Sequence, residues 1–141
     1  MFKIKLITIG KTKEAWLDVA LQEYTKRLSS VATIQWVLVK NLKELERSAD
    51  SLKPFICLDP QGISCTSEAF SKLLHQELIK RGSRLTLLIG GDEGLPPSLK
   101  DKASLLLSLS LLTFTHQMTR LILLEQLYRS FEIARGSPYH K

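Results

Sequence analysis

The sequence predicts an α/β fold in a single domain over residues 1–141, with a mainly parallel β-sheet and helices on both of its faces. Two observations support this prediction. Strand-like segments alternate along the chain with segments of helical periodicity, and several strand-like segments are apolar throughout, as strands buried on both faces are. The length of 141 residues is that of one domain, and no linker or internal repeat divides it.

The first elements follow from hydrophobic spacing. Residues 2–9 alternate between apolar residues and lysines, which is typical of a half-buried strand. Residues 14–28 place apolar or aromatic side chains at every fourth position, which indicates an amphipathic helix. A second strand is expected over residues 31–39 and a charged helix over residues 42–52.

The middle of the chain carries a short, fully apolar strand. Residues 55–58 fit a strand that is covered on both faces, and residues 59–62 (Asp-Pro-Gln-Gly) are expected to form the turn that ends it. Thr66 is a good N-cap for a helix over residues 67–80, and Gly82 is well placed to end that helix.

The last third of the chain repeats the alternation. Residues 85–89 are expected to form a buried strand that ends at two glycines, and Pro97 is expected in the first turn of a short helix. Residues 105–109 form the last predicted strand. Residues 117–134 form a long helix that is apolar almost all round. Such a helix is either buried in the core or packs one surface against a subunit partner.

Composition narrows the class of protein. The net charge of +6 fits a polyanionic partner such as nucleic acid, although charge alone does not establish one. No apolar run approaches the roughly 18 residues that cross a membrane, and the chain begins with a strand rather than a signal peptide. The two cysteines suit neither a disulfide framework nor a zinc site. We therefore expect a cytoplasmic protein with no membrane segment and no metal.

Three predicted strands end in loops that could bind a ligand. Ligands of open α/β sheets bind beyond the carboxyl ends of the strands, where this chain has residues 58–60, 90–94 and 108–115. Glycines allow a backbone to approach a ligand closely. Leucines beside backbone polar groups suit a purine. The alternative is that these segments are ordinary turns of a parallel sheet.

The end of the chain carries a second set of candidates. Glu125 and Arg129 are four residues apart, so they form a helical ion pair, or Arg129 contacts a substrate phosphate. Pro138, Tyr139 and His140 provide a rigid turn, an aromatic ring that can stack on a base, and a side chain that titrates near neutral pH. Taken alone, this segment could equally be an ordinary chain terminus.

The chain carries six short motifs: Ile89-Gly90-Gly91-Asp92-Glu93-Gly94, Leu107-Ser108-Leu109-Ser110, Thr113-Phe114, His116, Glu125-Gln126-Leu127-Tyr128-Arg129 and Gly136-Ser137-Pro138-Tyr139-His140-Lys141. Together, these motifs resemble a known family, ribosomal RNA large subunit methyltransferase H, a SPOUT-class enzyme that methylates N3 of a pseudouridine in 23S rRNA. The resemblance covers the whole length. It implies a SPOUT-type α/β fold with a C-terminal trefoil knot, a homodimer, and S-adenosyl-L-methionine as cofactor.

The resemblance also implies roles for individual residues. Arg129, Tyr139 and His140 fall on the substrate side, with the tail reaching across the dimer. Thr115 departs from the family pattern, because many relatives have proline before the histidine. The expected cofactor contacts are Leu58, Gly91, Ser110, Leu111, Leu112, Thr113, Phe114 and Thr115.

The implied reaction assigns the chemistry to the tail. His140 is the candidate for handling the N3 proton, since free imidazole titrates near pH ~6.5. Tyr139 is the better stacking platform, and Arg129 is suited to a phosphate or a developing negative charge. With few RNA-binding appendages, the enzyme is expected to act on assembled ribosomes. Two alternatives remain: a non-catalytic basic module that binds rRNA, and a SPOUT methyltransferase with another RNA target.

Overall fold

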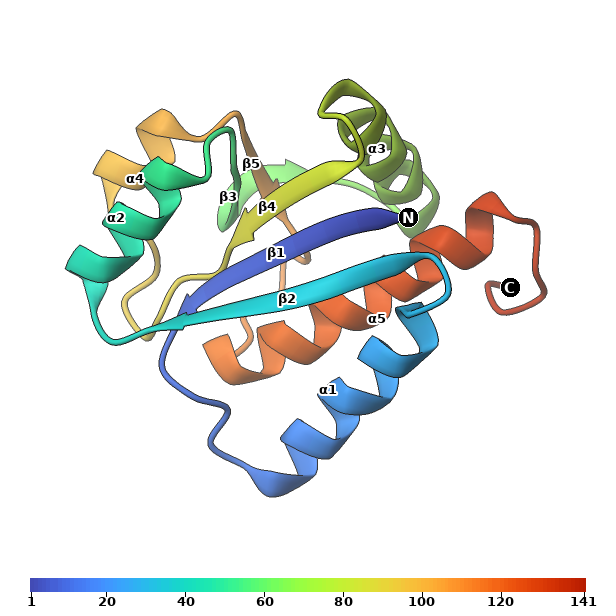
Figure 1. The fold of residues 1–141 in the computed structure, drawn as a ribbon, viewed down its shortest axis with the longest axis horizontal. Helices are drawn as coiled ribbons and strands as arrows, with labels where there is room; N and C mark the ends of the chain where they lie inside the picture. Colours follow the sequence, from blue (N-terminus) through green and yellow to red (C-terminus); the bar gives the residue numbers. More distant parts are fainter.

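The computed structural model describes residues 1–141 and shows a five-stranded sheet between two layers of helices (Figure 1). The strand order is β2-β1-β4-β3-β5, and every neighbouring pair is parallel. The predicted α/β class and parallel sheet are therefore confirmed. The strands are β1 (Phe2–Ile9), β2 (Ala32–Val39), β3 (Ile56–Ser64), β4 (Arg84–Leu88) and β5 (Leu105–Ser108), and the helices are α1 (Ala15–Leu28), α2 (Leu42–Ser51), α3 (Ser67–Lys80), α4 (Pro97–Lys102) and α5 (His116–Ala134).

Each face of the sheet has its own hydrophobic core. Helices α1, α3 and α5 cover one face over a cluster of 18 buried residues, and α2 and α4 cover the other over a cluster of 9. Neighbouring residues of β1 point to opposite cores, so Leu6 belongs to the larger cluster and Ile7 to the smaller. Burial on both faces explains why the central strands are apolar throughout.

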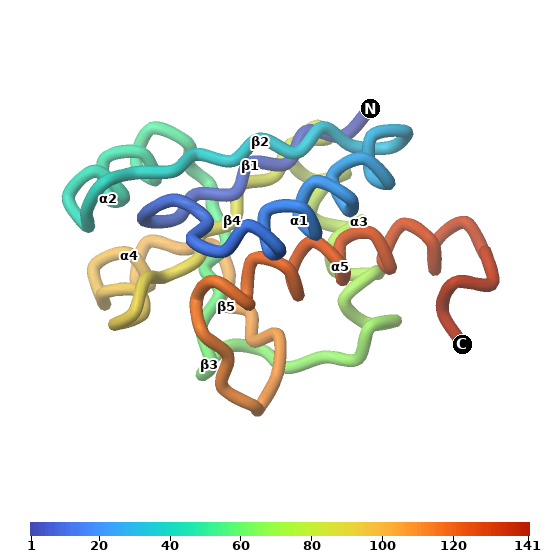
Figure 2. Tube along the Cα trace, turned by 90° about the horizontal axis from the view of Figure 1, so that it is seen from below, coloured from blue at the N-terminus to red at the C-terminus, as the bar shows by residue number.

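Helix α5 is the central helix of the larger layer. It contacts both α1 and α3, and Figure 2 shows it running beside α1 toward the carboxyl end of the chain. Leu123, Leu124 and Leu127 are fully buried, whereas Leu121 and Ile122 are only partly covered. The apolar helix is thus a core helix that also leaves a second apolar side partly exposed.

The prediction that β3 ends at Leu58 is wrong. The strand continues to Ser64, and both Leu58 and Ile63 lie opposite Leu107 on β5 because the register shifts between them. The backbone at Gly62 passes against β5 so closely that an added Cβ would lie 2.5 Å from the carbonyl carbon of Leu106. Asp-Pro-Gln-Gly therefore interrupts the strand without ending it.

The helix boundaries agree closely with the sequence. The Thr66 hydroxyl accepts a hydrogen bond from the Ala69 amide at 3.1 Å, as an N-cap does. Gly82, with φ of +65°, follows the end of α3. Helix α5 begins at His116, one residue earlier than expected. No helix of the structure combines the length and apolarity needed to cross a membrane.

Candidate functional site

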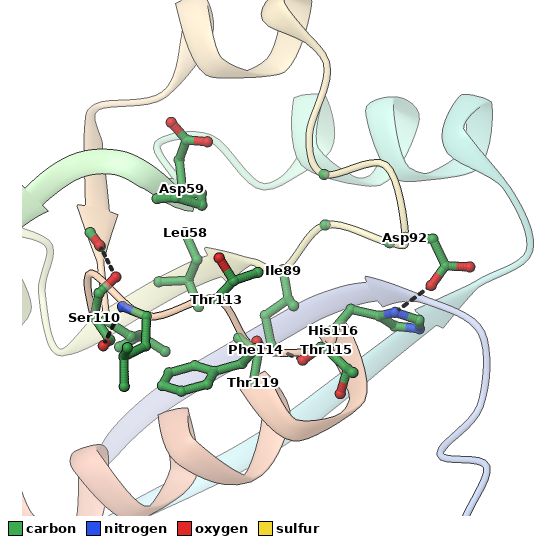
Figure 3. A pocket seen from close by; sticks show the side chains of 17 residues that line it. Leu58, Asp59, Ile89, Asp92, Ser110, Thr113, Phe114, Thr115, His116 and Thr119 are labelled. Carbon is green, nitrogen blue, oxygen red and sulfur yellow. Dashed lines mark hydrogen bonds and ion pairs between the residues drawn. The ribbon is translucent and has the colours of Figure 1, made fainter.

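A cavity of about 540 Å³ opens beyond the carboxyl ends of β4 and β5 and beside residues 58–60 of β3 (Figure 3). It is formed by the three segments that the sequence predicted as ligand-binding, residues 58–60, 90–94 and 108–115. Its size is within the range of about 300–1,000 Å³ that small-molecule sites occupy. The lining residues are Leu58, Asp59, Pro60, Ile89, Gly90, Gly91, Asp92, Gly94, Ser108, Leu109, Ser110, Leu112, Thr113, Phe114, Thr115, His116 and Thr119.

The loop between β5 and α5 is held by its own hydroxyl groups. Ser108 Oγ donates to the Ser110 carbonyl at 2.9 Å, and the Leu112 amide donates to Ser110 Oγ at 2.9 Å. Thr115 caps α5, since its hydroxyl accepts from the Met118 amide at 3.1 Å. Side-chain hydrogen bonds therefore order the loop before α5.

The glycine-rich turn after β4 forms another wall. A Cβ on Gly90 would lie 2.6 Å from the carbonyl carbon of Gly94, so only glycine allows this turn to close. Asp92 ties the turn to the first residue of α5, with 2.8 Å between Asp92 Oδ1 and His116 Nδ1 (Figure 3). Asp92 and His116 belong to the motifs that carry the family resemblance, but the sequence predicted no role for either residue. In the structure they close one side of the cavity.

Not every predicted cofactor residue lines this cavity. Leu58, Gly91, Ser110, Leu112, Thr113, Phe114 and Thr115 do. The side chain of Leu111 is 90% exposed and lies outside the lining. Asp59, which the sequence placed in a turn, is a lining residue. Its carboxylate turns toward α4, where Oδ1 lies 3.6 Å from Lys100 Nζ.

Arg129, Tyr139 and His140 gather at the other end of α5. We call them the tail cluster. Arg129 Nη1 donates to His140 Nδ1 at 3.0 Å, and the guanidinium carbon of Arg129 lies 4.8 Å from the centre of the Tyr139 ring. The ion pair between Arg129 and Glu125 is also present, with 2.7 Å between Nε and Oε1. The arginine thus connects the helix to the tail.

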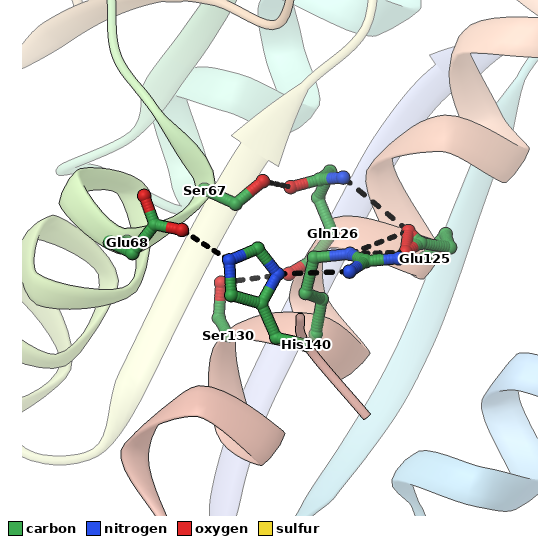
Figure 4. Close-up of polar contacts among 7 residues, drawn as sticks. Ser67, Glu68, Glu125, Gln126, Ser130 and His140 are labelled. Carbon is green, nitrogen blue, oxygen red and sulfur yellow. Dashed lines mark hydrogen bonds and ion pairs between the residues drawn. The ribbon is translucent and has the colours of Figure 1, made fainter. Parts of the chain in front are cut away.

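Both ring nitrogens of His140 have partners in this arrangement (Figure 4). Arginine only donates, so Nδ1 accepts and Nε2 carries the proton that faces the Glu68 carboxylate. Glu68 is on the first turn of α3, which is held to α5 by the 2.8 Å hydrogen bond between Ser67 and Gln126. Glu68 is thus a residue of this cluster that the sequence did not indicate.

Tyr139 is held in an aromatic environment. Its ring packs edge-on against Tyr128, with 4.8 Å between the ring centres. Burial, followed by a hydrogen bond with Tyr24, raises the pKa of Tyr139 to about 12. The phenol is therefore protonated at neutral pH and cannot accept a proton there.

Arg120 is a buried arginine for which no sequence pattern predicted a role. Its guanidinium is fully buried and donates to the Gly10 carbonyl at 2.9 Å and to the Ile9 carbonyl and Thr12 Oγ1 at 3.1 Å each. Burial lowers its pKa. It fixes the loop after β1 against the first turns of α5, next to the cavity.

The cavity and the tail cluster lie apart within one chain. Arg129 follows Thr115 by 14 residues, which is about 20 Å along an α-helix. No group of three or more His, Cys, Asp or Glu side chains is arranged to hold a metal ion. A reaction that uses both sets of residues therefore needs a second chain or a large movement of the tail.

Comparison with known proteins identifies the family. Residues 2–140 match a family model described as predicted SPOUT methyltransferase. The chain is 50% identical over 141 residues to ribosomal RNA large subunit methyltransferase H of Protochlamydia amoebophila, with all of both chains covered. It is 40% identical over 158 residues to the protein of that name from Streptococcus equi subsp. zooepidemicus, with 99% of both chains covered.

A solved structure has the same fold. A probable methylase family protein from Haemophilus influenzae superposes on 98% of this chain and 70% of its own length, with a TM-score of 0.61 and 9% sequence identity. At that identity the likeness concerns the fold alone. Together with the family model and the full-length relatives, it shows that this chain belongs to the SPOUT methyltransferases and, within them, to the family of ribosomal RNA large subunit methyltransferase H.

Proposed function

We propose that this chain is a single-domain S-adenosylmethionine-dependent methyltransferase that methylates N3 of a pseudouridine in 23S rRNA. Family membership over the full length supports the reaction class and the RNA substrate. The observation that carries the proposal is the cavity at the carboxyl edge of the sheet, whose lining includes most of the residues that the family resemblance assigns to the cofactor. A ribosomal substrate would make the protein cytoplasmic.

The lining fits the proposed cofactor. Leu58, Leu109 and Phe114 offer apolar surface for an adenine ring, and the hydroxyls of Ser110 and Thr113 offer polar contacts for its edge or the ribose. When bound, the cofactor supplies an electrophilic methyl group on a sulfonium sulfur. We also propose that the segment from β4 to α5, which builds the cavity, carries the trefoil knot of the family.

The proposed enzyme is a homodimer in which the tail of one protomer reaches the cavity of the other. Two observations favour it. The cavity and tail cluster are about 20 Å apart along α5. Large apolar side chains are also exposed at the cavity rim, with Leu111 at 90%, Leu112 at 74% and Met118 at 36%. A partner protomer would cover this rim and bring its own tail to the cavity.

Within this site, His140 handles the proton. N3 of the pseudouridine carries a proton, so methylation there would need a residue that accepts this proton. Once Arg129 releases His140 Nδ1, that nitrogen can accept the proton while Glu68 holds the N–H at Nε2. Tyr139 stays protonated and stacks on the nucleobase of the substrate. Arg129 is then free to contact a phosphate or the developing negative charge.

The decisive experiment measures transfer of a labelled methyl group from S-adenosylmethionine to ribosomes that lack the modification. Mass spectrometry of 23S fragments should place the label on N3 of one pseudouridine. Free 23S rRNA should be a poor substrate, because the chain has few RNA-binding appendages. The His140→Ala variant should bind the cofactor as the wild type does and lose transfer, whereas Lys141→Ala should keep it.

Other outcomes would redirect the assignment. Cofactor binding without labelled ribosomes would favour a SPOUT methyltransferase with another RNA target. Neither binding nor label would leave a non-catalytic module that binds rRNA. Full turnover by His140→Ala would remove the proposed base, and equal rates on ribosomes and free 23S rRNA would remove the requirement for assembled ribosomes.

A further inference from the structure

A second hollow, of about 320 Å³, lies at the opposite end of the sheet from the cavity. It is formed by the amino-terminal halves of β1, β2 and β4 and by the chain segments that precede β3 and β4. None of its lining residues is aromatic and none is acidic. The charged lining residues are Lys3, Lys5, Lys53, Arg81 and Arg84.

Strand register places the polar side chains of this hollow on one face. Lys3 lies opposite Thr33 on β2 and Arg84 on β4, and Lys5 occupies the same face two residues later. Ile7, the next residue on that face, is buried in the core under α2 and α4. The two helices thus cover only the carboxyl half of this face, and the amino half is left to a row of polar side chains.

The charges in this hollow are only partly balanced. Lys53 pairs with Asp50 at 3.4 Å, and Arg81 pairs with Glu77 at 3.0 Å. Lys3, Lys5 and Arg84 form no ion pair. We call these three the basic row.

The basic row has an energetic cost in the free protein. Lys3 and Arg84 are direct neighbours on adjacent strands, and like charges in that position destabilise a sheet. The Nε of Arg81, at the same hollow, is buried with no hydrogen-bond partner. An anion bound in the hollow would relieve the repulsion between Lys3 and Arg84.

We propose that the basic row binds the phosphodiester backbone of RNA. The cations are spread over two strands, and Lys3 and Lys5 are separated by about 7 Å along β1, which suits a chain of phosphates better than a single anion. The hollow offers no aromatic ring for base stacking, and its cations suit phosphates, so the contact would position the RNA backbone. The inference rests on the proposed function, because rRNA is the polyanion that this function supplies.

The test compares two triple variants of equal charge. Lys3→Gln, Lys5→Gln and Arg84→Gln remove the basic row. Lys26→Gln, Lys40→Gln and Lys43→Gln remove three exposed cations that form no ion pair elsewhere on the protein. Binding to large ribosomal subunits is measured across a range of salt concentrations, together with the affinity for S-adenosylmethionine and the melting temperature.

The basic-row variant should bind subunits about 10-fold more weakly at physiological salt, with a slope of log K against log salt smaller by about 2–3. The control variant should keep the wild-type slope within about half a unit. Both should bind S-adenosylmethionine as the wild type does. The basic-row variant should melt no lower than the wild type, since a like-charge contact is removed. If the triple variant does not fold, Lys3→Gln with Arg84→Gln alone should still reduce the slope.

Three outcomes separate this inference from the proposed function. A wild-type slope in the basic-row variant, with methyl transfer by the wild type intact, overturns the RNA contact alone. Weaker binding of inorganic phosphate with unchanged subunit binding would identify a small-anion site and also overturn it. If the wild type neither binds S-adenosylmethionine nor transfers methyl groups, the proposed function fails, and a reduced slope in the basic-row variant would still support the RNA contact.

Discussion

Arg120 shows how a single buried charge can fix the loops around a site. Its guanidinium is fully buried without a carboxylate partner. Its two terminal nitrogens donate to the carbonyls of Ile9 and Gly10 and to the hydroxyl of Thr12, whereas Nε has no hydrogen-bond partner. Hydrogen bonds to a charged group are stronger than neutral ones, and a buried charge needs them. The residue therefore joins the β1–α1 loop to the helix that borders the cavity.

Replacing Arg120 with alanine should reduce the free energy of unfolding by about 2–4 kcal/mol, because the Ile9 and Gly10 carbonyls lose a charged donor and a void is left. Denaturant unfolding monitored by circular dichroism measures the loss. Arg47→Ala is the control: Arg47 is exposed and has no hydrogen-bonded partner, so its removal should change stability by less than about 0.5 kcal/mol. Equal effects of the two variants would contradict a structural role for Arg120.

Tyr139 links the docking of the tail to pH. Its pKa is about 12 when docked and about 10 in an unfolded chain, so docking favours the protonated phenol. The stabilisation of the docked tail by this burial is complete below about pH 10 and is lost as the pH rises through about 12. Burial also raises the pKa of Tyr128, so ultraviolet titration should show delayed ionisation of both tyrosines, and Tyr139→Phe should remove the component near pH 12. A variant curve that matches the normalised wild-type curve would show that Tyr139 is not buried in this way.

The sequence predicted roles and contacts of individual residues only where helical spacing or the family resemblance related them. The four-residue spacing of Glu125 and Arg129 predicted their contact, and the 2.7 Å ion pair is present. The contacts of His140 with Glu68, 72 residues away, could not be predicted, since no local pattern relates the two positions. Nor could the sequence separate Leu111 from Leu112 in their exposure to the cavity.

The close approach of β3 to β5 depends on Gly62. An added Cβ would overlap the backbone of Leu106 and Leu107 at 2.5–2.6 Å, and a backbone cannot move aside as a flexible side chain can. Gly62→Ala should therefore weaken the pairing of the two strands and destabilise the protein by about 1–3 kcal/mol.

Gly91 provides the matched control for Gly62. A Cβ there would find its nearest neighbour, Ile9 Cδ1, at 3.9 Å, which is an ordinary contact. Gly91→Ala should leave the melting temperature close to that of the wild type, although it lines the cavity. Thermal unfolding of both variants is the measurement. Equal melting temperatures would show that β3 and β5 tolerate separation at Gly62.

The elements themselves were largely predictable. Periodicity, an N-cap at Thr66 and the proline at Pro97 located the start of every helix to within two residues. The failure at β3 has a physical reason. Turn-forming residues indicate that regular strand pairing stops, but they do not indicate whether the strand continues after them. The pairing of Ile63 with β5 depends on a strand register that is set by tertiary structure.

Across the whole molecule, α5 separates the two groups of candidate residues. Its first turn borders the cavity and Arg129 lies about 20 Å further along. Strand order is a property of the assembled chain, so sequence patterns did not reveal it. Because of the separation along α5, each active site of the proposed dimer would combine the cavity of one protomer with the tail of its partner.

Complementation tests this arrangement. Co-expression of His140→Ala with Gly91→Trp gives mixed dimers in which one chain has an intact cavity and the other an intact tail. If sites form across the interface, one site of each mixed dimer works, and the mixture should show roughly a quarter of wild-type methyl transfer to ribosomes, since about half of random dimers are mixed. Each variant alone should be inactive. An inactive mixture that still contains mixed dimers, seen by native mass spectrometry, would mean that each tail serves its own cavity.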